Sequence, residues 1–263
     1  MIDLHIHSNF SDGSSSVEEI IQKANYLGLT QIAITDHNIL KGSILGSQIS
    51  DIDFIIGTEL STDYNHVEIH LLSYFPNGSD YKNVQFIINE GEAYKKIAML
   101  ETIENLNKMG IDIDITDASK YGKGIINRVH ICKAMMEKGY ISSIDEGFKN
   151  YVGDDCEAFV ERKTVSLFEA IEAVHKDGGI AIIAHPYEYT KLNIDEFLDD
   201  ALKYADGVEC FHPSANEEQS KHLVEIANKY NKIITGGSDY HGINKPDINL
   251  GMMNVDEKYK INK

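Results

Sequence analysis

The sequence predicts an α/β fold in which strands and helices alternate along the chain. Short apolar runs are separated by helical segments on both sides of a central stretch, as expected for parallel strands covered by helices. Two of these helices begin at capping-box patterns, Ser15–Glu18 and Ser166–Glu169. Nearly every strand also ends in His, Asp or Glu, and in a β/α barrel the carboxyl ends of the strands build one active site.

Composition limits the function classes. The chain has 263 residues, 42% of them apolar, which suits one large domain or one domain with an insertion. The formal net charge of −18 argues against a long nucleic-acid partner, which needs clustered Lys and Arg. A small anion held at a local metal centre remains compatible with that charge.

Three widely spaced cysteines, Cys132, Cys156 and Cys210, give no sign of a disulfide framework, so we expect a reducing cytoplasm. The opening residues lack a basic segment followed by an apolar one, and we expect no signal peptide. No apolar run approaches the roughly 18 residues that a membrane span requires.

The first part of the chain contains four expected strands. The first carries His5 and His7, and a helix over residues 17–27, ended by Gly28, follows it. Residues 31–35 form the second strand and lead to Asp36-His37. Residues 53–56 form the third strand, followed by Glu59, and residues 67–74 form the fourth, which carries His70.

The pattern changes over residues 81–162, where helical periodicities replace strands. One helix is closed by Gly110, and another over residues 128–136 is closed by Gly139. We therefore expect one metal-binding domain from residues 1–80 and 163–263, with 81–162 as a helical cap that contributes to the substrate site. Additional outer-layer helices are the alternative for this stretch.

Strand and helix alternate again in the last hundred residues. Apolar strands are expected over residues 180–184, 207–211 and 233–235. They carry or precede His185, Glu209 with His212, and Asp239 with His241.

These polar strand ends predict a metal centre. Because side chains alternate along a strand, His5 and His7 point to one face while Leu4 and Ile6 point to the other. So many imidazoles and carboxylates at one rim would be costly unless they held an ion, since buried charges are normally paired or metal-bound. Imidazole nitrogen with carboxylate oxygen suits Zn, Mn or Fe. A carboxylate such as Glu59 can bridge two ions.

In these residues the chain resembles a known family, the polymerase and histidinol phosphatase (PHP) family of metal-dependent phosphoesterases. The matching residues are Asp3-Leu4-His5-x-His7-Ser8, Ser11-Asp12-Gly13, Thr35-Asp36-His37, Glu59, His70, Ala184-His185-Pro186 and Gly237-Ser238-Asp239-Tyr240-His241-Gly242. Two further segments, Arg128-Val129-His130 and Glu209-x-x-His212-Pro213, resemble one bacterial branch. That branch acts on nucleoside 3′,5′-bisphosphates and short 5′-phosphorylated ribonucleotides, with AMP as a bound product.

The resemblance implies a distorted (β/α)7 barrel with two or three divalent ions. It implies one ion on His5, His7, Glu59 and Asp239, a second on Glu59, His70 and His185, and a third on Asp12, His37 and His241. Histidinol phosphatases tend to carry His at the position of Asp12. The carboxylate in this chain therefore changes the expected ligand set of the third ion. Asp36 could orient His37 or cap its strand.

The resemblance also implies a mechanism. A water on the ions would attack phosphorus, with Asp239 in the catalytic centre. Arg128 offers a bidentate fork for a phosphate, although a surface salt bridge is the alternative. His130 would bind the phosphate or lie at the metal rim. His212 would bind the phosphate or protonate the leaving oxygen, or it makes only a strand-end hydrogen bond. Glu209 would pair with Arg128 or with a ligand histidine.

We therefore expect a cytoplasmic, metal-dependent phosphatase of small nucleotides, using Mn, Zn or Fe. The expected chain is a monomer or small homo-oligomer without a long nucleic acid or a membrane as partner. A histidinol-phosphatase-like enzyme acting on another metabolite and a non-catalytic PHP module are the alternatives.

Overall fold

The computed structural model describes residues 1–122, 126–161 and 163–262. The chain divides into two compact units. The first comprises Met1–Ile88 and Val165–Lys263, and the second comprises Asn89–Thr164. Residues 123–125 and 162, which belong to the expected insertion 81–162, lie outside the described residues.

The strands of the first unit form two sheets. Their bounds are β1 Ile2–Asp3, β2 Gln31–Ile32, β3 Asp53–Phe54, β4 Ile56–Tyr64, β5 Val67–Phe75, β6 Ile180–Ile183, β7 Gly207–Phe211 and β8 Ile233–Gly236. One sheet has the order β1-β2-β3 and is parallel. The other has the order β4-β5-β6-β7-β8, in which β5 is antiparallel to both of its neighbours and β6, β7 and β8 are parallel.

The mixed α/β class is confirmed, whereas a closed (β/α)7 barrel is not, because the described strands lie in two sheets that are not closed. The regular alternation is interrupted where β4 and β5 form a hairpin. Its turn residues Asn65 and His66 both have positive φ, 53° and 62°, as a tight two-residue hairpin turn requires. As a result, Glu59 lies within β4. The expectation that it follows the end of a strand is therefore wrong.

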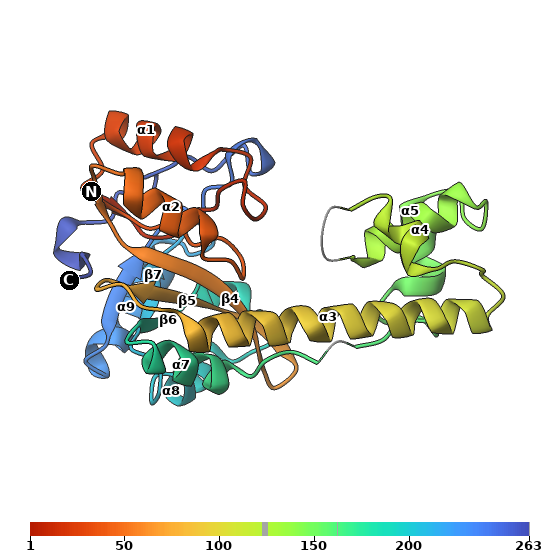
Figure 1. Ribbon diagram of the computed structural model, residues 1–263. Coiled ribbons are helices and arrows are strands. Elements are labelled where there is room, and N and C mark those ends of the chain that lie inside the picture. The colour runs from red at the N-terminus through yellow and green to blue at the C-terminus, as the bar shows by residue number, and fades with distance from the viewer. Residues whose placement is uncertain (123–125, 162, 263) are drawn as a thin grey trace. The chain divides into compact units, whose positions relative to one another are not determined.

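Among the described residues, five α-helices lie wholly within the first unit. Their bounds are α1 Val17–Leu27, α2 Lys41–Ile49, α7 Leu167–Lys176, α8 Ile194–Ala201 and α9 Glu217–Lys229, and the short helices η2 Pro186–Glu188, η3 Gly242–Asn244 and η4 Glu257–Tyr259 follow strands or close the chain. In Figure 1, α1 and α2 lie on one side of the strands of this unit, and α7 and α8 lie on the opposite side.

Capping residues fix where these helices begin and end. The capping box of α7 at Ser166 and Glu169 is confirmed. The box of α1 is formed by Ser16 and Glu19, one residue later than expected. Gly28 closes α1 at φ 69°, a left-handed conformation that glycine adopts without strain.

The segment after β1 links the hydrophobic core to the polar centre. Leu4 and Ile6 are fully buried in two core clusters, one with Ile55 and Ile182 and the other with Ile20. Hydrogen bonds outside the strands continue the pairing of this segment, since Leu4 N–H donates to Gly236 O (3.2 Å). Because Leu4 and Ile6 pack into the hydrophobic core, the side chains of His5 and His7 point to the opposite face, toward the polar centre.

The second unit is helical and has a core of its own. Helix α3, Lys82–Lys108, begins in the first unit and continues into the second, where α4 Ile115–Ser119, α5 Arg128–Glu137, α6 Ile144–Gly147 and the π-helix η1 Phe148–Val152 follow. The core includes Ile103, Leu106, Ile131 and Met135, all buried.

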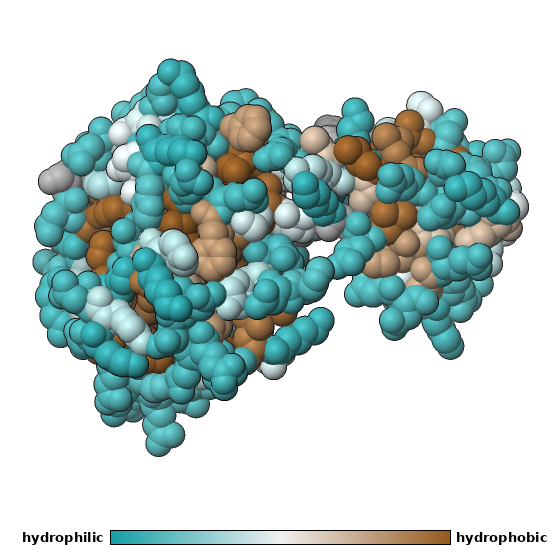
Figure 2. Space-filling view, turned by 90° about the horizontal axis from the view of Figure 1, so that it is seen from below, coloured by the Kyte–Doolittle hydropathy of each residue, from teal (hydrophilic) through white to brown (hydrophobic). Residues whose placement is uncertain are grey.

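Polar side chains cover most of the face of each unit that Figure 2 shows, with hydrophobic residues dispersed among them. Within the part of the chain that the structure describes, no helix combines the length and apolar content of a transmembrane span.

Gly237 provides a test of how closely the segments that follow β1 and β8 approach each other. A Cβ atom at this position would lie 2.4 Å from both Cβ and the backbone nitrogen of His5. We expect Gly237→Ala to lower the free energy of unfolding by about 2 kcal/mol, because the backbone of His5 would have to move. Urea denaturation monitored by circular dichroism measures this change.

Gly91→Ala is the matched control. Nothing lies within 4 Å of a Cβ at Gly91, which is in the interior of α3, so the substitution should stabilise the protein by about 0.5–1 kcal/mol. Wild-type stability of Gly237→Ala would contradict the close approach.

Candidate metal centre

Eleven His, Asp and Glu side chains of the first unit form one cluster. They are His5, His7, Asp12, His37, Glu59, His70, His185, Glu209, His212, Asp239 and His241. The cluster thus draws residues from the segments after β1, β2, β6, β7 and β8 and from within β4, β5 and β7. This arrangement brings together residues that are more than two hundred positions apart in the sequence.

The innermost group contains His5, His7 and Glu59, all of which are buried. The Nε2 atoms of the two histidines are 3.1 Å apart. Glu59 Oε2 lies 3.3 Å from His5 Nε2 and 3.1 Å from His7 Nε2. Three electron-donating atoms that face one another at this distance form a natural cation site.

Asp239 extends this group from the opposite side. Its Oδ1 lies 3.5 Å from His5 Nε2, 3.3 Å from His7 Nε2 and 3.4 Å from His241 Nδ1. Asp239 has φ 53° and His185 has φ 24°, conformations that residues with a side chain rarely adopt. Such backbone strain is concentrated at functional sites, where the surrounding structure enforces it.

The two oxygens of Glu59 face different histidines. Oε2 faces His5 and His7, and His37 Nδ1 at 3.1 Å. Oε1 lies 2.8 Å from His70 Nδ1 and 3.0 Å from His185 Nε2. A carboxylate placed in this way can bridge two cations.

Asp12 and His241 form the outer part of the cluster. Asp12 Oδ1 lies 3.2 Å from His241 Nε2, and Asp12 Oδ2 lies 3.7 Å from His37 Nε2. His241 Nδ1 donates to the carbonyl oxygen of Asp239 at 2.8 Å, which leaves Nε2 to face Asp12. Asp12 is more exposed than the inner residues, with 56% of its side chain accessible.

Each of the three expected ligand sets is therefore in mutual proximity. The sets also share members, since His7 approaches Asp12 and His37 approaches Glu59. Their assignment as metal ligands stays a prediction, and the geometry is compatible with it.

The donor atoms fit divalent cations. Four buried polar atoms of the cluster have no hydrogen-bond partner among the described residues: His7 Nδ1, Glu59 Oε2, His185 Nδ1 and His212 Nε2. A buried polar atom without a partner costs about 1–3 kcal/mol, so a role in ligand binding is a natural explanation. A mixed set of imidazole nitrogens and carboxylate oxygens suits Zn, Mn and Fe.

Electrostatics within the cluster are strongly coupled. Burial would lower the pKa of His5, but the carboxylates of Glu209, Glu59 and Asp239 raise it well above its usual value. Burial would raise the pKa of Glu59, but the surrounding histidines, His5 first, hold it well below its usual range. Burial would also lower the pKa of His70, but the carboxylate of Glu59 raises it to about 10. The cluster thus favours positive charge next to its carboxylates, and a divalent ion can supply that charge.

Glu209 orients two of the inner residues. Its Oε1 accepts a hydrogen bond from His5 Nδ1 (3.0 Å), and its Oε2 accepts one from the backbone N–H of His185 (2.9 Å). Because Nδ1 of His5 donates to Glu209, Nε2 is the ring nitrogen that faces the cluster and would bind a cation. Of the two partners considered for Glu209, the structure therefore gives the candidate ligand histidines.

Two buried aspartates fix the loops that carry the cluster. Asp3 accepts hydrogen bonds from the backbone and hydroxyl of Ser238 and from the backbone of Gly251. Asp36 accepts from the backbone and hydroxyl of Ser8 and from the hydroxyl of Ser11. These contacts differ from the two roles considered for Asp36. They fix the loop before Asp12.

Two charged residues at the edge of the cluster were missed by sequence reasoning. Glu188 Oε2 lies 3.4 Å from His185 Nδ1, and Lys245 Nζ lies 2.5 Å from Asp239 Oδ2. Each follows a recognised motif by a few residues, but no pattern of residue types distinguishes it from surface charge. Only the three-dimensional contacts identify them.

Arg128 and His130 belong to the second unit, on α5. Arg128 Nη1 donates to Val152 O (3.1 Å) and to Asp154 Oδ1 (2.5 Å). Its guanidinium carbon lies 5.3 Å from the ring centre of Phe148 and 5.1 Å from that of Phe159. The expected phosphate contacts of both residues stay predictions.

His130 participates in the capping of its own helix. Its Nδ1 accepts a hydrogen bond from the backbone N–H of Asn127 at 3.3 Å. Burial, with the charges of Lys133 and Lys95, lowers its pKa.

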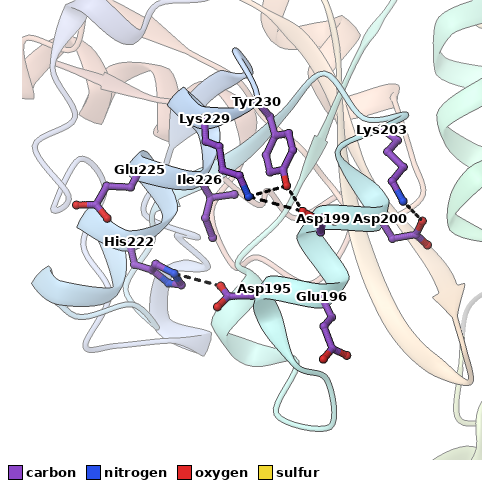
Figure 3. A pocket seen from close by; sticks show the side chains of 10 residues that line it. All are labelled: Asp195, Glu196, Asp199, Asp200, Lys203, His222, Glu225, Ile226, Lys229 and Tyr230. Carbon is purple, nitrogen blue, oxygen red and sulfur yellow. Dashed lines mark hydrogen bonds and ion pairs between the residues drawn. The ribbon is translucent and has the colours of Figure 1, made fainter.

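A separate groove of about 560 Å³ lies between α8 and α9 (Figure 3). Its charged side chains pair with one another, as in Asp195 with His222 (3.1 Å) and Asp200 with Lys203 (3.2 Å). None of its lining residues belongs to the histidine–carboxylate cluster. The reactive chemistry of the first unit is therefore concentrated in the cluster and not in this groove.

The chain is similar in sequence to one protein family and to several of its members. The PHP domain model matches residues 3–235. A 5′-3′ exoribonuclease from Haemophilus influenzae is 28% identical over 245 residues, which cover 91% of this chain and 89% of that protein. A phosphoribosyl 1,2-cyclic phosphate 1,2-diphosphodiesterase from Eggerthella lenta is 27% identical over 255 residues, covering 91% and 94%. A 3′,5′-nucleoside bisphosphate phosphatase from Chromobacterium violaceum is 23% identical over 257 residues, covering 91% and 87%.

Solved structures show the same relationship. A Bifidobacterium adolescentis protein assigned to the metal-dependent phosphoesterases superposes with a TM-score of 0.73 at 27% identity, covering 98% of this chain and 93% of that one. An amidohydrolase from Chromobacterium violaceum superposes with a TM-score of 0.69 at 22% identity, covering 93% and 88%, and supports the fold.

The position of Glu209 leads to a prediction about metal affinity. In Glu209→Gln only one oxygen remains to accept from both His5 Nδ1 and the His185 backbone, so one of them loses its acceptor. We expect the affinity for the divalent ion to fall roughly 10- to 100-fold. Competition with a chromogenic chelator measures this affinity.

Asp206→Asn is the matched control. Asp206 Oδ2 also accepts from a histidine ring (His175 Nε2, 2.8 Å) and from a backbone N–H (Ala181, 2.8 Å), and it lies just before β7, outside the cluster. Metal affinity should be unchanged in this variant. Equal losses in the two variants would show that Glu209 acts only through general stability.

Proposed function

We propose that this chain, which belongs to the PHP family of metal-dependent phosphoesterases, hydrolyses phosphomonoesters of small nucleotides. The observation that carries the proposal is the buried convergence of His5, His7, Glu59, His185 and Asp239 on one centre. The substrate class that we favour is a nucleoside 3′,5′-bisphosphate or a short 5′-phosphorylated oligoribonucleotide. Relatives described as an exoribonuclease and a nucleoside bisphosphate phosphatase support this choice.

The centre would hold two or three divalent ions, drawn from Mn, Zn and Fe. His5, His7, Glu59 and Asp239 would hold the first, and Glu59 would share the second with His70 and His185. The third would be held by Asp12, His37 and His241. Such ions supply Lewis acidity, which activates water and stabilises negative charge on phosphoryl oxygens.

His212 is suited to protonate the leaving oxygen. The backbone N–H of Ser214 donates to Nδ1 of His212 (3.1 Å), so the proton of the neutral ring resides on Nε2. Nε2 is buried and faces Asp239 Oδ2 at 3.4 Å. His212 is therefore oriented with Nε2 toward the centre, from where the ring would transfer a proton to the leaving oxygen when it is in its imidazolium form. Asp239 would both bind metal and orient this ring.

Arg128 and His130, which belong to the second unit, would bind a phosphate group of the substrate. The aromatic rings of Phe148 and Phe159 restrict the guanidinium of Arg128, which reduces the conformational entropy lost when it binds an anion. Asp154 is then the carboxylate that a phosphate would displace.

We also infer that the two sheets are parts of one distorted (β/α)7 barrel. Isolated bridges link Ile6, after β1, with Tyr240, after β8, and link His37, after β2, with Glu59 in β4. With these links, β1, β2, β4, β5, β6, β7 and β8 would form a ring. A ring would explain why the residues at its edge face a single centre.

The acidic composition supports a small substrate, with no long nucleic acid as partner. We propose a cytoplasmic enzyme that is a monomer or a small homo-oligomer.

Metal removal followed by a phosphate-release screen tests the function. The full chain is treated with a chelator and assayed with and without Mn²⁺ on adenosine 3′,5′-bisphosphate, a 5′-phosphorylated dinucleotide and histidinol phosphate. We expect activity to disappear on chelation, to return with Mn²⁺, and to be highest on the nucleotides. A preference for histidinol phosphate would favour the alternative enzyme, and no release from any phosphoester would favour a non-catalytic module.

Replacement of the bridging carboxylate tests the centre itself. Glu59→Ala removes the carboxylate whose Oε2 faces His5 and His7 and whose Oε1 faces His70 and His185. Phosphate release should therefore fall by about a thousandfold or more, which is about 4 kcal/mol of transition-state stabilisation. Elemental analysis should show less bound metal. Glu217→Ala, on the exposed surface of α9, is the control and should keep both properties.

Arg128→Ala tests the contribution of the second unit. Loss of a bidentate phosphate contact should raise KM for the nucleotide about tenfold with a smaller change in kcat. Arg128→Lys keeps the charge without the fork and should give an intermediate KM. If both variants have wild-type kinetics, Arg128 has no part in substrate binding.

A further inference from the structure

Lys245 contacts the outer oxygen of Asp239. Its Nζ lies 2.5 Å from Asp239 Oδ2, and His212 Nε2 lies 3.4 Å from the same atom. The other oxygen, Oδ1, faces the buried pair His5 and His7. Asp239 thus separates an inner side, where a cation would bind, from an outer side that presents two N–H donors.

The backbone around Lys245 is fixed to the cluster. Gly242, at φ 66°, begins the turn η3, and the N–H of Lys245 donates to Gly242 O (3.3 Å). The turn is tied to the loop of Asp12, because Ile243 N–H donates to Ser14 Oγ (2.8 Å) and Asn244 Nδ2 donates to Asp12 O (2.8 Å). The base of the lysine side chain is therefore held in place.

The side chain itself reaches from the surface to the centre. Lys245 is 44% exposed, whereas Asp239 is 11% exposed. A lysine ammonium on a flexible stem can change its acceptor without any movement of the backbone. It is therefore accessible to an anion that arrives from solvent.

We propose that Lys245 binds the phosphoryl group of the substrate beside His212. This inference rests on the proposed phosphoesterase function and adds a phosphate-recognition residue to it. When a divalent ion takes up the charge of Asp239, the carboxylate becomes a weaker partner for the ammonium. A phosphate dianion then offers more negative charge and several acceptor oxygens.

The competing explanation is that Lys245 only neutralises Asp239. In that case a bound metal ion would take over its role, and the lysine would make no contact with substrate. The two explanations differ in a measurable way, because the first concerns affinity for phosphate and the second concerns affinity for metal.

The test uses the metal-loaded full chain and inorganic phosphate as the probe. We expect Lys245→Met to retain the metal content of the wild type and to bind inorganic phosphate about tenfold more weakly, by calorimetry and as a competitive inhibitor. KM for the phosphomonoester should rise more than kcat falls. Lys245→Arg should restore most of the phosphate affinity.

Lys221→Met is the matched control for net charge. Lys221 is exposed on α9, where it pairs with Glu217 at 2.8 Å, and its replacement changes the net charge by the same amount. Phosphate affinity should be unchanged in this variant. A loss equal to that of Lys245→Met would overturn the proposal, because it would show a general electrostatic effect.

Wild-type phosphate affinity in Lys245→Met would also overturn the proposal, with or without a gain in metal affinity. Failure of the proposed function gives a different result: the wild-type chain would bind no divalent ion or release no phosphate from any ester. Thermal melting of Lys245→Met and Lys245→Arg verifies that both variants are folded.

Discussion

The burial of Glu59 among histidines is the interaction on which the rest of the site depends. Its carboxylate is almost inaccessible to water and lies within 3.3 Å of nitrogens from five imidazoles, those of His5, His7, His37, His70 and His185. An ionised carboxylate cannot be buried without compensating charge. Five rings from four segments, those after β1, β2 and β6 and strand β5 itself, can provide it only if every segment ends at a defined place. This one side chain therefore links the geometry of the centre to the fold of the whole unit.

The fold meets this requirement with polar contacts as well as with strands. Assigned strands are short at β1 and β2, and the segments after them carry most of the centre. Buried carboxylates then add to the backbone pairing that continues beyond these strands: Asp3 joins the start of the chain to Ser238, and Asp36 joins the segment after β2 to Ser8. Glu209 does the same for the His5 ring and the His185 backbone. The result is an outer set of acidic residues that are satisfied by protein donors, surrounding an inner set whose partners would be metal ions.

Sequence reasoning found what periodicity and chemistry determine. The direction of His5 and His7 follows from strand alternation with Leu4 and Ile6, and the ends of α1 and α7 follow from serine caps and glycine. It missed the β4–β5 hairpin, because Asn65-His66 is a weaker turn signal than Asn-Gly, and it therefore placed Glu59 beyond a strand. Glu188 and Lys245 were also missed. Glu188 contacts His185 and Lys245 contacts Asp239, and neither contact can be predicted from the spacing of residues in the sequence.

An acidic net charge is compatible with a phosphate ester as substrate once the distance over which charges act is considered. The formal charge of −18 is distributed over the whole chain, and at physiological ionic strength charges are largely screened beyond about 8 Å. A small phosphomonoester at the centre would therefore respond to the local cations, which are the proposed metal ions and the ammonium of Lys245. A long polyanion would instead extend over the acidic surface and meet repulsion at each phosphate. The same charge distribution that is compatible with a small substrate would thus oppose a large one, so electrostatics would act on substrate size in addition to shape.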